Sequence, residues 1–159
     1  MKEVKMRRYQ NLLTISGLGV IAFAVWSVMK TIMLFAMRKE LLIDVLAASD
    51  DMTFKVTLIS ILVLILLVDF LVRLYVGLSA RAEGFGKKKG YVYIIFAILL
   101  ALTSLGAVVM TFFNISPGSS VAELVVSVIV EATSIVVVIE LLVASFNVKK
   151  LRKELTEVQ

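Results

Sequence analysis

Long apolar stretches alternate with short polar ones along this chain, and four of the apolar stretches are long enough to be membrane spans. They cover residues 12–35, 54–78, 91–113 and 121–146. A bilayer core of about 30 Å needs roughly 20 helical residues at about 1.5 Å per residue. The pattern therefore predicts an all-α integral membrane protein, in which four transmembrane helices form one bundle and a single domain occupies residues 1–159.

Composition agrees with this pattern. Apolar residues make up 60% of the chain, the mean hydropathy is +1.02 and there is one proline, which places the chain outside the soluble globular class. The first apolar stretch is full length, so we interpret it as a retained span and not as a cleaved signal. Because Cys and His are both absent, disulfides, thiolate or imidazole metal sites and nucleophilic Cys chemistry are excluded. We expect no metal and no cofactor.

Positive charge is concentrated before the first span, between the second and third spans in residues 79–90, and after the fourth in residues 147–159. The positive-inside rule then predicts that both termini and the 79–90 loop are cytoplasmic. The four tyrosines also fall near these ends of the spans, where we expect them at headgroup level. A bacterial plasma membrane is the default location.

The basic residues of the loop and tail form the expected contact surface. Near a membrane, each can attract anionic headgroups with about 1 kcal/mol, and an acidic cytoplasmic protein is an alternative partner. The loop lacks the strand and the Lys-Ser or Lys-Thr pair of a nucleotide-binding P-loop, and we expect no specific nucleic-acid binding. The contact residues are Arg81, Lys87, Lys88, Lys89, Lys149, Lys150, Arg152 and Lys153.

Five ionisable residues lie well within the predicted spans: Lys30, Asp69, Arg73, Glu131 and Glu140. Each would cost about 2.5 to 3.5 kcal/mol against lipid at the bilayer centre, so we expect them to form an intramembrane polar centre. Asp69 and Arg73 are four residues apart, which places them on one helix face in the favourable order for an ion pair.

Lys30 and Arg73 cannot neutralise all three in-span carboxylates. One of these acids must therefore be protonated or meet another cation. Burial disfavours the charged form of a carboxyl group. Glu131 is central and comes at a depth similar to that of Asp69, so we predict that Glu131 is the odd acid, either protonated or bound to a cation.

The fourth span carries a polar stripe that could line a hydrated path. Glu123, Ser127, Glu131, Ser134 and Ser145 fall within a narrow arc at about 100° per residue. Two alternatives remain open. Hydroxyl residues also let helices approach and hydrogen-bond across their contact, and Glu123 stands at the capping-box position three residues after Ser120. The third span is uncharged, and we expect it to be the most lipid-facing or a purely structural member.

Two main functions remain. The first is a small non-enzymatic membrane protein, an oligomeric anchoring or sensing subunit that meets partners through its basic cytoplasmic face. The second is a proton- or cation-conducting channel or transporter, with Asp69, Arg73 and Glu131 as its central site.

A membrane enzyme acting on lipids or amphiphiles is a third class. Length and helix number are similar to those of the membrane-associated eicosanoid and glutathione metabolism proteins. Residues 73–75 (RLY), followed by Glu83, resemble part of their second-helix motif. Val76 and Ala80 stand where that motif has an arginine and an asparagine, so the glutathione-binding role is not carried over. We expect no enzymatic activity.

Overall fold

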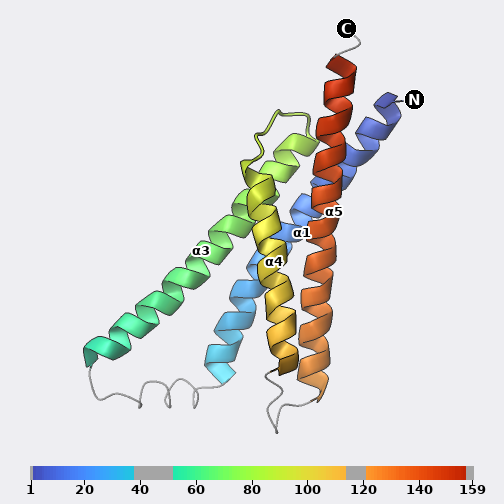
Figure 1. Ribbon diagram of the computed structural model, residues 1–159. Coiled ribbons are helices and arrows are strands. Elements are labelled where there is room, and N and C mark those ends of the chain that lie inside the picture. Colours follow the sequence, from blue (N-terminus) through green and yellow to red (C-terminus); the bar gives the residue numbers. More distant parts are fainter. Residues whose placement is uncertain (1, 38–51, 114–120, 157–159) are drawn as a thin grey trace.

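The structure, a computed structural model, describes residues 2–37, 52–113 and 121–156 (Figure 1). These residues form four helices and contain no strand. The helices are α1 (Lys2–Met37), α3 (Met52–Gly84), α4 (Val92–Phe113) and α5 (Val121–Thr156). Each contains a segment long and apolar enough to cross a membrane. The predicted all-helical architecture with four membrane-length helices is therefore confirmed.

Three helices extend beyond their apolar stretches on the side of the basic residues. α1 begins at Lys2, α3 continues to Gly84 and α5 continues to Thr156. Lys, Arg and Glu are good helix formers, so the helical backbone can continue past the apolar residues. The expected 79–90 loop is thus helical as far as Gly84, and most of the expected 147–159 tail is the last part of α5.

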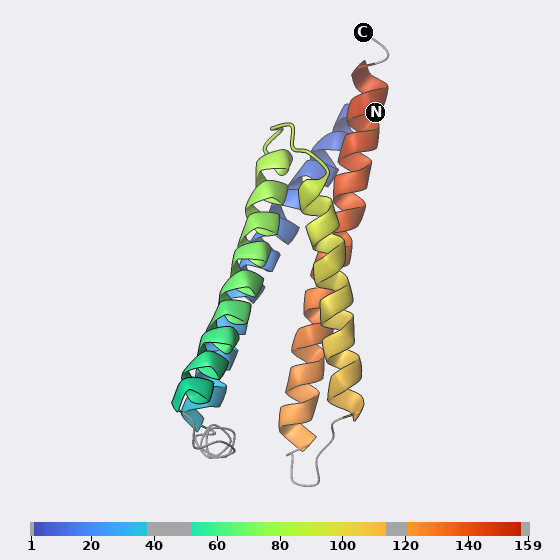
Figure 2. The ribbon, with the colours of Figure 1, turned by 60° about the vertical axis from the view of Figure 1, so that its left-hand side comes forward.

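The N-terminal end of α1, the C-terminal end of α5 and the α3–α4 connection all lie at one end of the molecule (Figure 1). We call this end the basic end, because it carries the Lys and Arg residues of 2–8, 81–89 and 149–153. Consecutive helices run antiparallel. α1 packs against both α3 and α5, and α4 packs mainly against α5. Figure 2 shows that the α1–α3 and α4–α5 pairs lie close together at the basic end and diverge toward the opposite end.

The core lies toward the basic end. In α3 the buried residues are Val76, Gly77, Ser79, Ala80 and Glu83, all in the last third of the helix. The 18-residue apolar window of α3 has no buried residue, whereas 28% of the corresponding window of α4 is buried. Of the two alternatives for the third span, the first, that it is the most lipid-facing, is therefore wrong, because α3 leaves the bundle along most of its length. The second, a purely structural role, stays a prediction. The buried apolar residues are Leu13, Val20, Ala24, Val76, Ala80, Tyr93, Ile94, Ala97, Leu100, Val138, Leu141, Ala144 and Val148.

Glycines bring α1 and α3 into backbone contact. A Cβ atom on Gly77 would lie 2.7 Å from the carbonyl oxygen of Gly17, and one on Gly17 would lie 2.8 Å from that of Gly77. Gly84 lies about two helical turns after Gly77, closer to the basic end. A Cβ on Gly84 would lie 2.8 Å from the Gln10 carbonyl oxygen. Small residues allow such close approach between membrane helices. These contacts fix the α1–α3 pair at the depth where the core is densest.

Candidate functional site

A fully buried carboxylate, Glu83, lies near the end of α3 and joins three helices. Its side chain is 0% exposed. The Tyr93 hydroxyl of α4 donates a hydrogen bond to Glu83 Oε2. A second hydrogen bond of 2.8 Å joins the Tyr93 hydroxyl to Ser145 Oγ of α5. Since the phenol has one proton and a carboxylate only accepts, the serine is the donor in this second bond.

Two cations from α5 face the other oxygen of Glu83. Lys149 Nζ is 3.6 Å and Arg152 Nη1 is 3.5 Å from Oε1. Ser145, Lys149 and Arg152 are spaced four and three residues apart, which places all three on one face of the helix. We call Glu83, Tyr93, Ser145, Lys149 and Arg152 the Glu83 cluster. With two cations around one carboxylate, the cluster is held together by charge as well as by hydrogen bonds.

Lys149 also ties the α3–α4 connection to α5. Its ammonium donates to the carbonyl oxygens of Lys89 at 2.8 Å and Gly90 at 3.1 Å. The same ammonium lies 4.3 Å from the centre of the Tyr91 ring, within cation–π range. One side chain thus holds the connecting loop, the start of α4 and the buried carboxylate in one arrangement.

The helix end that carries Glu83 is closed by a Schellman motif. Lys87 N–H donates to the Ala82 carbonyl and Gly86 N–H donates to the Glu83 carbonyl. Gly86 has a φ of 88°, the left-handed conformation that this motif requires and that glycine adopts without strain. The sequence G-F-G therefore ends α3 at Gly84, one residue after Glu83, and turns the chain toward α4.

The Glu83 cluster is closed to solutes. Glu83 and Ser145 are fully buried and Tyr93 is 1% exposed. Glu83 Oε1 and Arg152 Nη2 have no hydrogen-bond partner within the part of the chain that the structure describes. A general acid or base must reach its substrate within hydrogen-bonding distance. The geometry is that of an electrostatic clamp between helices.

The charges predicted to form one polar centre divide into separate pairs. Arg73 Nε donates to Asp69 Oδ2 at 2.9 Å within α3, the local pair that the spacing predicts. Lys30 Nζ of α1 lies 3.7 Å from Glu131 Oε1 of α5. Glu131 therefore has an internal cation beside it, and whether it is also protonated or binds a further cation stays a prediction. The Asp69–Arg73 pair lies on α3, whereas the Lys30–Glu131 pair joins α1 and α5. The two pairs are separate because α3 diverges from α5 at this depth.

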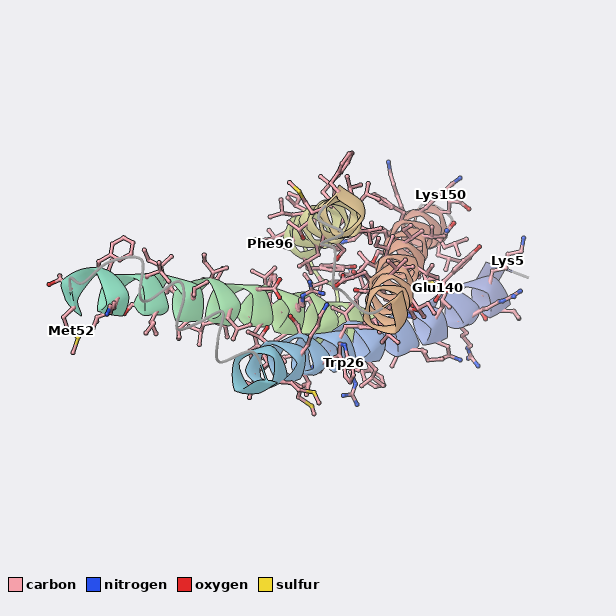
Figure 3. All side chains as sticks on the ribbon, turned by 90° about the horizontal axis from the view of Figure 1, so that it is seen from below. Lys5, Trp26, Met52, Phe96, Glu140 and Lys150 are labelled. Carbon is pink, nitrogen blue, oxygen red and sulfur yellow. The ribbon has the colours of Figure 1, made fainter. Side chains whose placement is uncertain are left out.

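Glu140 is the acid without a cation. It is exposed on α5, and no ion pair or hydrogen bond links it to another described residue. Figure 3, seen from the end opposite the basic end, labels it beside α5, and shows Met52 at the start of α3 far from α4 and α5. The structure does not bring Glu140 together with Lys30, Asp69, Arg73 or Glu131.

The residues of the predicted polar path take part in different contacts, and their role as a path stays a prediction. Ser134 is buried, while Ser145 belongs to the Glu83 cluster. The side chains of Glu123 and Ser127 lie outside the described residues. Ser134 has a buried counterpart, Ser104, on α4. The hydrogen bond between Tyr93 and Ser145 sets the register of the antiparallel helices α4 and α5. Ser104 comes eleven residues after Tyr93 and Ser134 eleven residues before Ser145, so the two serines lie at one level. Neither hydroxyl has a hydrogen-bond partner among the described residues.

The predicted basic contact surface is smaller than the sequence indicated. Lys149 and Arg152 turn inward to Glu83, with side chains 12% and 20% exposed. Arg81 is partly buried, with its guanidinium 5.5 Å from the Phe85 ring centre. The residues that remain exposed are Lys87, Lys88, Lys89, Lys150 and Lys153.

Sequence reasoning missed the Glu83 cluster. It placed Tyr93 at headgroup level with the other tyrosines, whereas Tyr93 is buried and Tyr91 is exposed. A usable signal exists in the spacing of Ser145, Lys149 and Arg152, which puts two cations on the apolar face of α5.

No family model, curated protein sequence or solved structure matches the chain. Within the described residues, no three Asp or Glu side chains group closely enough to hold a metal ion.

Proposed function

We propose that this protein is a non-enzymatic integral membrane subunit that anchors or organises partners at an anionic bilayer surface. Its four helices cross a bacterial plasma membrane with both termini and the basic end in the cytoplasm. Four helices of membrane length support insertion. The charge asymmetry between the ends supports the orientation by the positive-inside rule.

The observation that carries this proposal is the construction of the basic end. The Glu83 cluster fixes α3, α4 and α5 to one another, and Lys149 holds the backbone of residues 89 and 90. Lys87, Lys88 and Lys89 are exposed on that connection. A fixed loop presents three ammonium groups together without the entropy cost of ordering a flexible segment at the moment of binding. The surface matches phosphate-bearing headgroups.

Lipid selectivity tests this function. The protein is reconstituted in vesicles of phosphatidylcholine and phosphatidylglycerol, and spin-labelled lipids report the fraction of each that is immobilised at the protein surface. We expect phosphatidylglycerol to be preferred several-fold at low salt, since each basic residue near the surface contributes about 1 kcal/mol. The preference should weaken with salt, because exposed charges are screened.

The matched variants separate charge from structure. Replacing Lys87, Lys88 and Lys89 together by Ala should abolish most of the preference, while replacing the same three by Arg should retain it. Equal preference in all three proteins would refute the assigned surface. Because the chain has no Cys, a single cysteine placed at Lys88 also tests the orientation: a membrane-impermeant thiol reagent should label it only after the cytoplasmic side is opened.

A second candidate function, proton conduction, has one specific observation in its favour. Ser104 and Ser134 are buried, lack hydrogen-bond partners within the described residues, and lie at one level of the α4–α5 contact. Glu131 is three residues from Ser134, nearly one turn along α5. Water bound between the two hydroxyls would extend the polar group of Lys30 and Glu131 toward α4.

Proton flux into vesicles tests this second function. A conducting protein should dissipate an imposed pH gradient, and Glu131→Gln should abolish the flux while Glu140→Gln leaves it unchanged. Silent vesicles, or a flux that persists in Glu131→Gln, would exclude a path through this group.

A further inference from the structure

Glu140 has a position that no contact within the described chain explains. The two cations well within the spans are accounted for: Arg73 pairs with Asp69, and Lys30 pairs with Glu131. Glu140 has no hydrogen bond or ion pair to any described residue. The part of the chain that the structure describes therefore supplies no counter-charge to Glu140.

Glu140 lies deep within the apolar part of α5. Nine residues separate it from Glu131 on one side and nine from Lys149 on the other, which is about 13.5 Å each way along a helix. Its exposed neighbours on the same side of α5 are Val136 and Val143, with 54% and 49% exposure. The carboxylate is thus surrounded by surface suited to hydrocarbon or to another apolar helix.

The direction of the side chain prevents a simple escape to water. Side chains of an α-helix tilt toward its N-terminus. The N-terminus of α5 is at the end opposite the basic end (Figure 1), so a Glu140 side chain that follows this tendency points away from the basic end. A glutamate is also shorter than the Lys and Arg side chains that reach the headgroups by snorkelling. A cover of complementary charge is the remaining way to keep the group ionised.

A second copy of this chain does not supply that cover. A two-fold interface centred on Glu140 would bring two carboxylates together. The in-span cations of a second copy, Lys30 and Arg73, already lie beside their own acids. A different protein is therefore the favoured source of the complementary charge.

We propose that the outward face of α5 around Glu140 docks a transmembrane helix of a partner protein, and that this helix carries a Lys or Arg at the depth of Glu140. The apolar residues Val136 and Val143 provide the packing surface, and Glu140 provides the specificity, because an unpaired charge inside the membrane penalises any partner without a cation at that level. This inference names a partner for the subunit role proposed above and rests on it.

A designed transmembrane peptide tests the interaction. The peptide is a single apolar helix with one Lys at the depth of Glu140, and parallel peptides carry Leu or Glu there. The full-length protein is labelled at a cysteine introduced at Lys150, and energy transfer to labelled peptide is measured in phosphatidylcholine vesicles. We expect the Lys peptide to bind at least tenfold more tightly than the Leu peptide, and the Glu peptide to bind no better than the Leu peptide.

Variants of the protein complete the test. Glu140→Gln should remove the tenfold preference, and Glu140→Lys should transfer it to the Glu peptide. Glu131→Gln is the matched control, since it removes an acid of the same helix that already has a cation, and it should leave the preference intact.

Three results would overturn the proposal. The first is equal binding of all peptides to the wild-type protein. The second is Glu140-dependent transfer between two labelled copies of the protein that the Lys peptide does not disrupt, which would assign the face to self-association. The third is an infrared band of a protonated carboxyl group that disappears in Glu140→Gln, which would show a neutral acid facing lipid. None of these depends on the lipid selectivity of Lys87, Lys88 and Lys89, so the two proposals fail independently.

Discussion

The half of the molecule near the basic end and the opposite half are packed very differently, and the apolar windows of α3 and α4 differ in burial, 0% against 28%, at the same mean hydropathy of 2.6. Near the basic end, α1 and α3 are in backbone contact at Gly17 and Gly77, and Glu83 is fully buried among groups from three helices. In the opposite half, the helix pairs diverge (Figure 2), and no residue of 52–75 in α3 is buried. Hydrophobicity therefore does not decide where membrane-length helices associate. Small residues and complementary polar groups do, because lipid is as apolar as the side chains it would replace.

The two glutamates Glu83 and Glu140 show the difference between a packed helix face and an outward one at single residues. Glu83 is on the face of α3 that meets α4 and α5, and its charge is matched inside the chain. Glu140 is on the outward face of α5, and its charge is not matched by a described residue. One side chain type thus serves as an internal clamp on a buried helix face and as an unmatched surface charge on an outward one.

The largest expected effect comes from removing the clamp. Glu83→Ala should lower the free energy of unfolding by about 3 to 5 kcal/mol, since it leaves Lys149 and Arg152 without their buried counter-charge. Reversible unfolding in micelles measures the change. Glu140→Ala is the matched control in the other environment and should change stability by less than about 0.5 kcal/mol. Equal losses of unfolding free energy in the two variants would contradict the difference between the buried Glu83 and the exposed Glu140.

Replacing a glycine by alanine should lower stability at Gly77, near the basic end, and raise it at Gly106, in the opposite half. Gly77→Ala adds a Cβ that would lie 2.7 Å from a backbone oxygen of α1, and we expect a loss of about 1 to 3 kcal/mol from overpacking. Gly106→Ala, in the opposite half of α4, adds a Cβ with nothing within 4 Å. Because Ala is the better helix former, stability should rise by up to about 1 kcal/mol. The same unfolding measurement reports both, and a gain for Gly77→Ala would refute the close α1–α3 contact.

A pair of neighbouring tyrosines tests the hydrogen bonds of the clamp alone. Tyr93→Phe removes the hydroxyl that binds Glu83 and Ser145, and we expect a loss of about 1 to 3 kcal/mol because both partners become unsatisfied. Tyr91→Phe retains the ring that faces the Lys149 ammonium and removes only an exposed hydroxyl. It should be neutral within about 0.5 kcal/mol. The two variants in the same micelles give the comparison directly.

The smallest effect is expected for the ion pair of the opposite half. Lys30 and Glu131 are separated by 3.7 Å, and the Lys30 side chain is 39% exposed. A double-mutant cycle with Lys30→Met and Glu131→Gln should give a coupling of about 0.6 kcal/mol, the average for polar contacts between membrane helices. A coupling above about 3 kcal/mol would mean that this pair is as important as Glu83 and would remove the contrast between the two halves.

The sequence by itself determined the features that depend on residues close together in the chain. Four apolar stretches of sufficient length dictated four helices, because backbone groups in an apolar environment must be paired internally. The Asp69–Arg73 pair followed from a spacing of four residues on one helix. The inventory also required that one of three acids remain without an in-span cation.

Which acid remained, and which residues formed the clamp, were decided only by the tertiary structure. Lys30 meets Glu131, and Glu83 meets Tyr93, Lys149 and Arg152, because of the rotation and depth of helices that are far apart in sequence. A rotation of one residue, about 100°, would turn Glu83 away from α5 and change every pair. Apolar side chains face lipid and protein at similar free energy, so hydropathy could not fix these rotations. The glycine contacts and the buried polar groups fixed them.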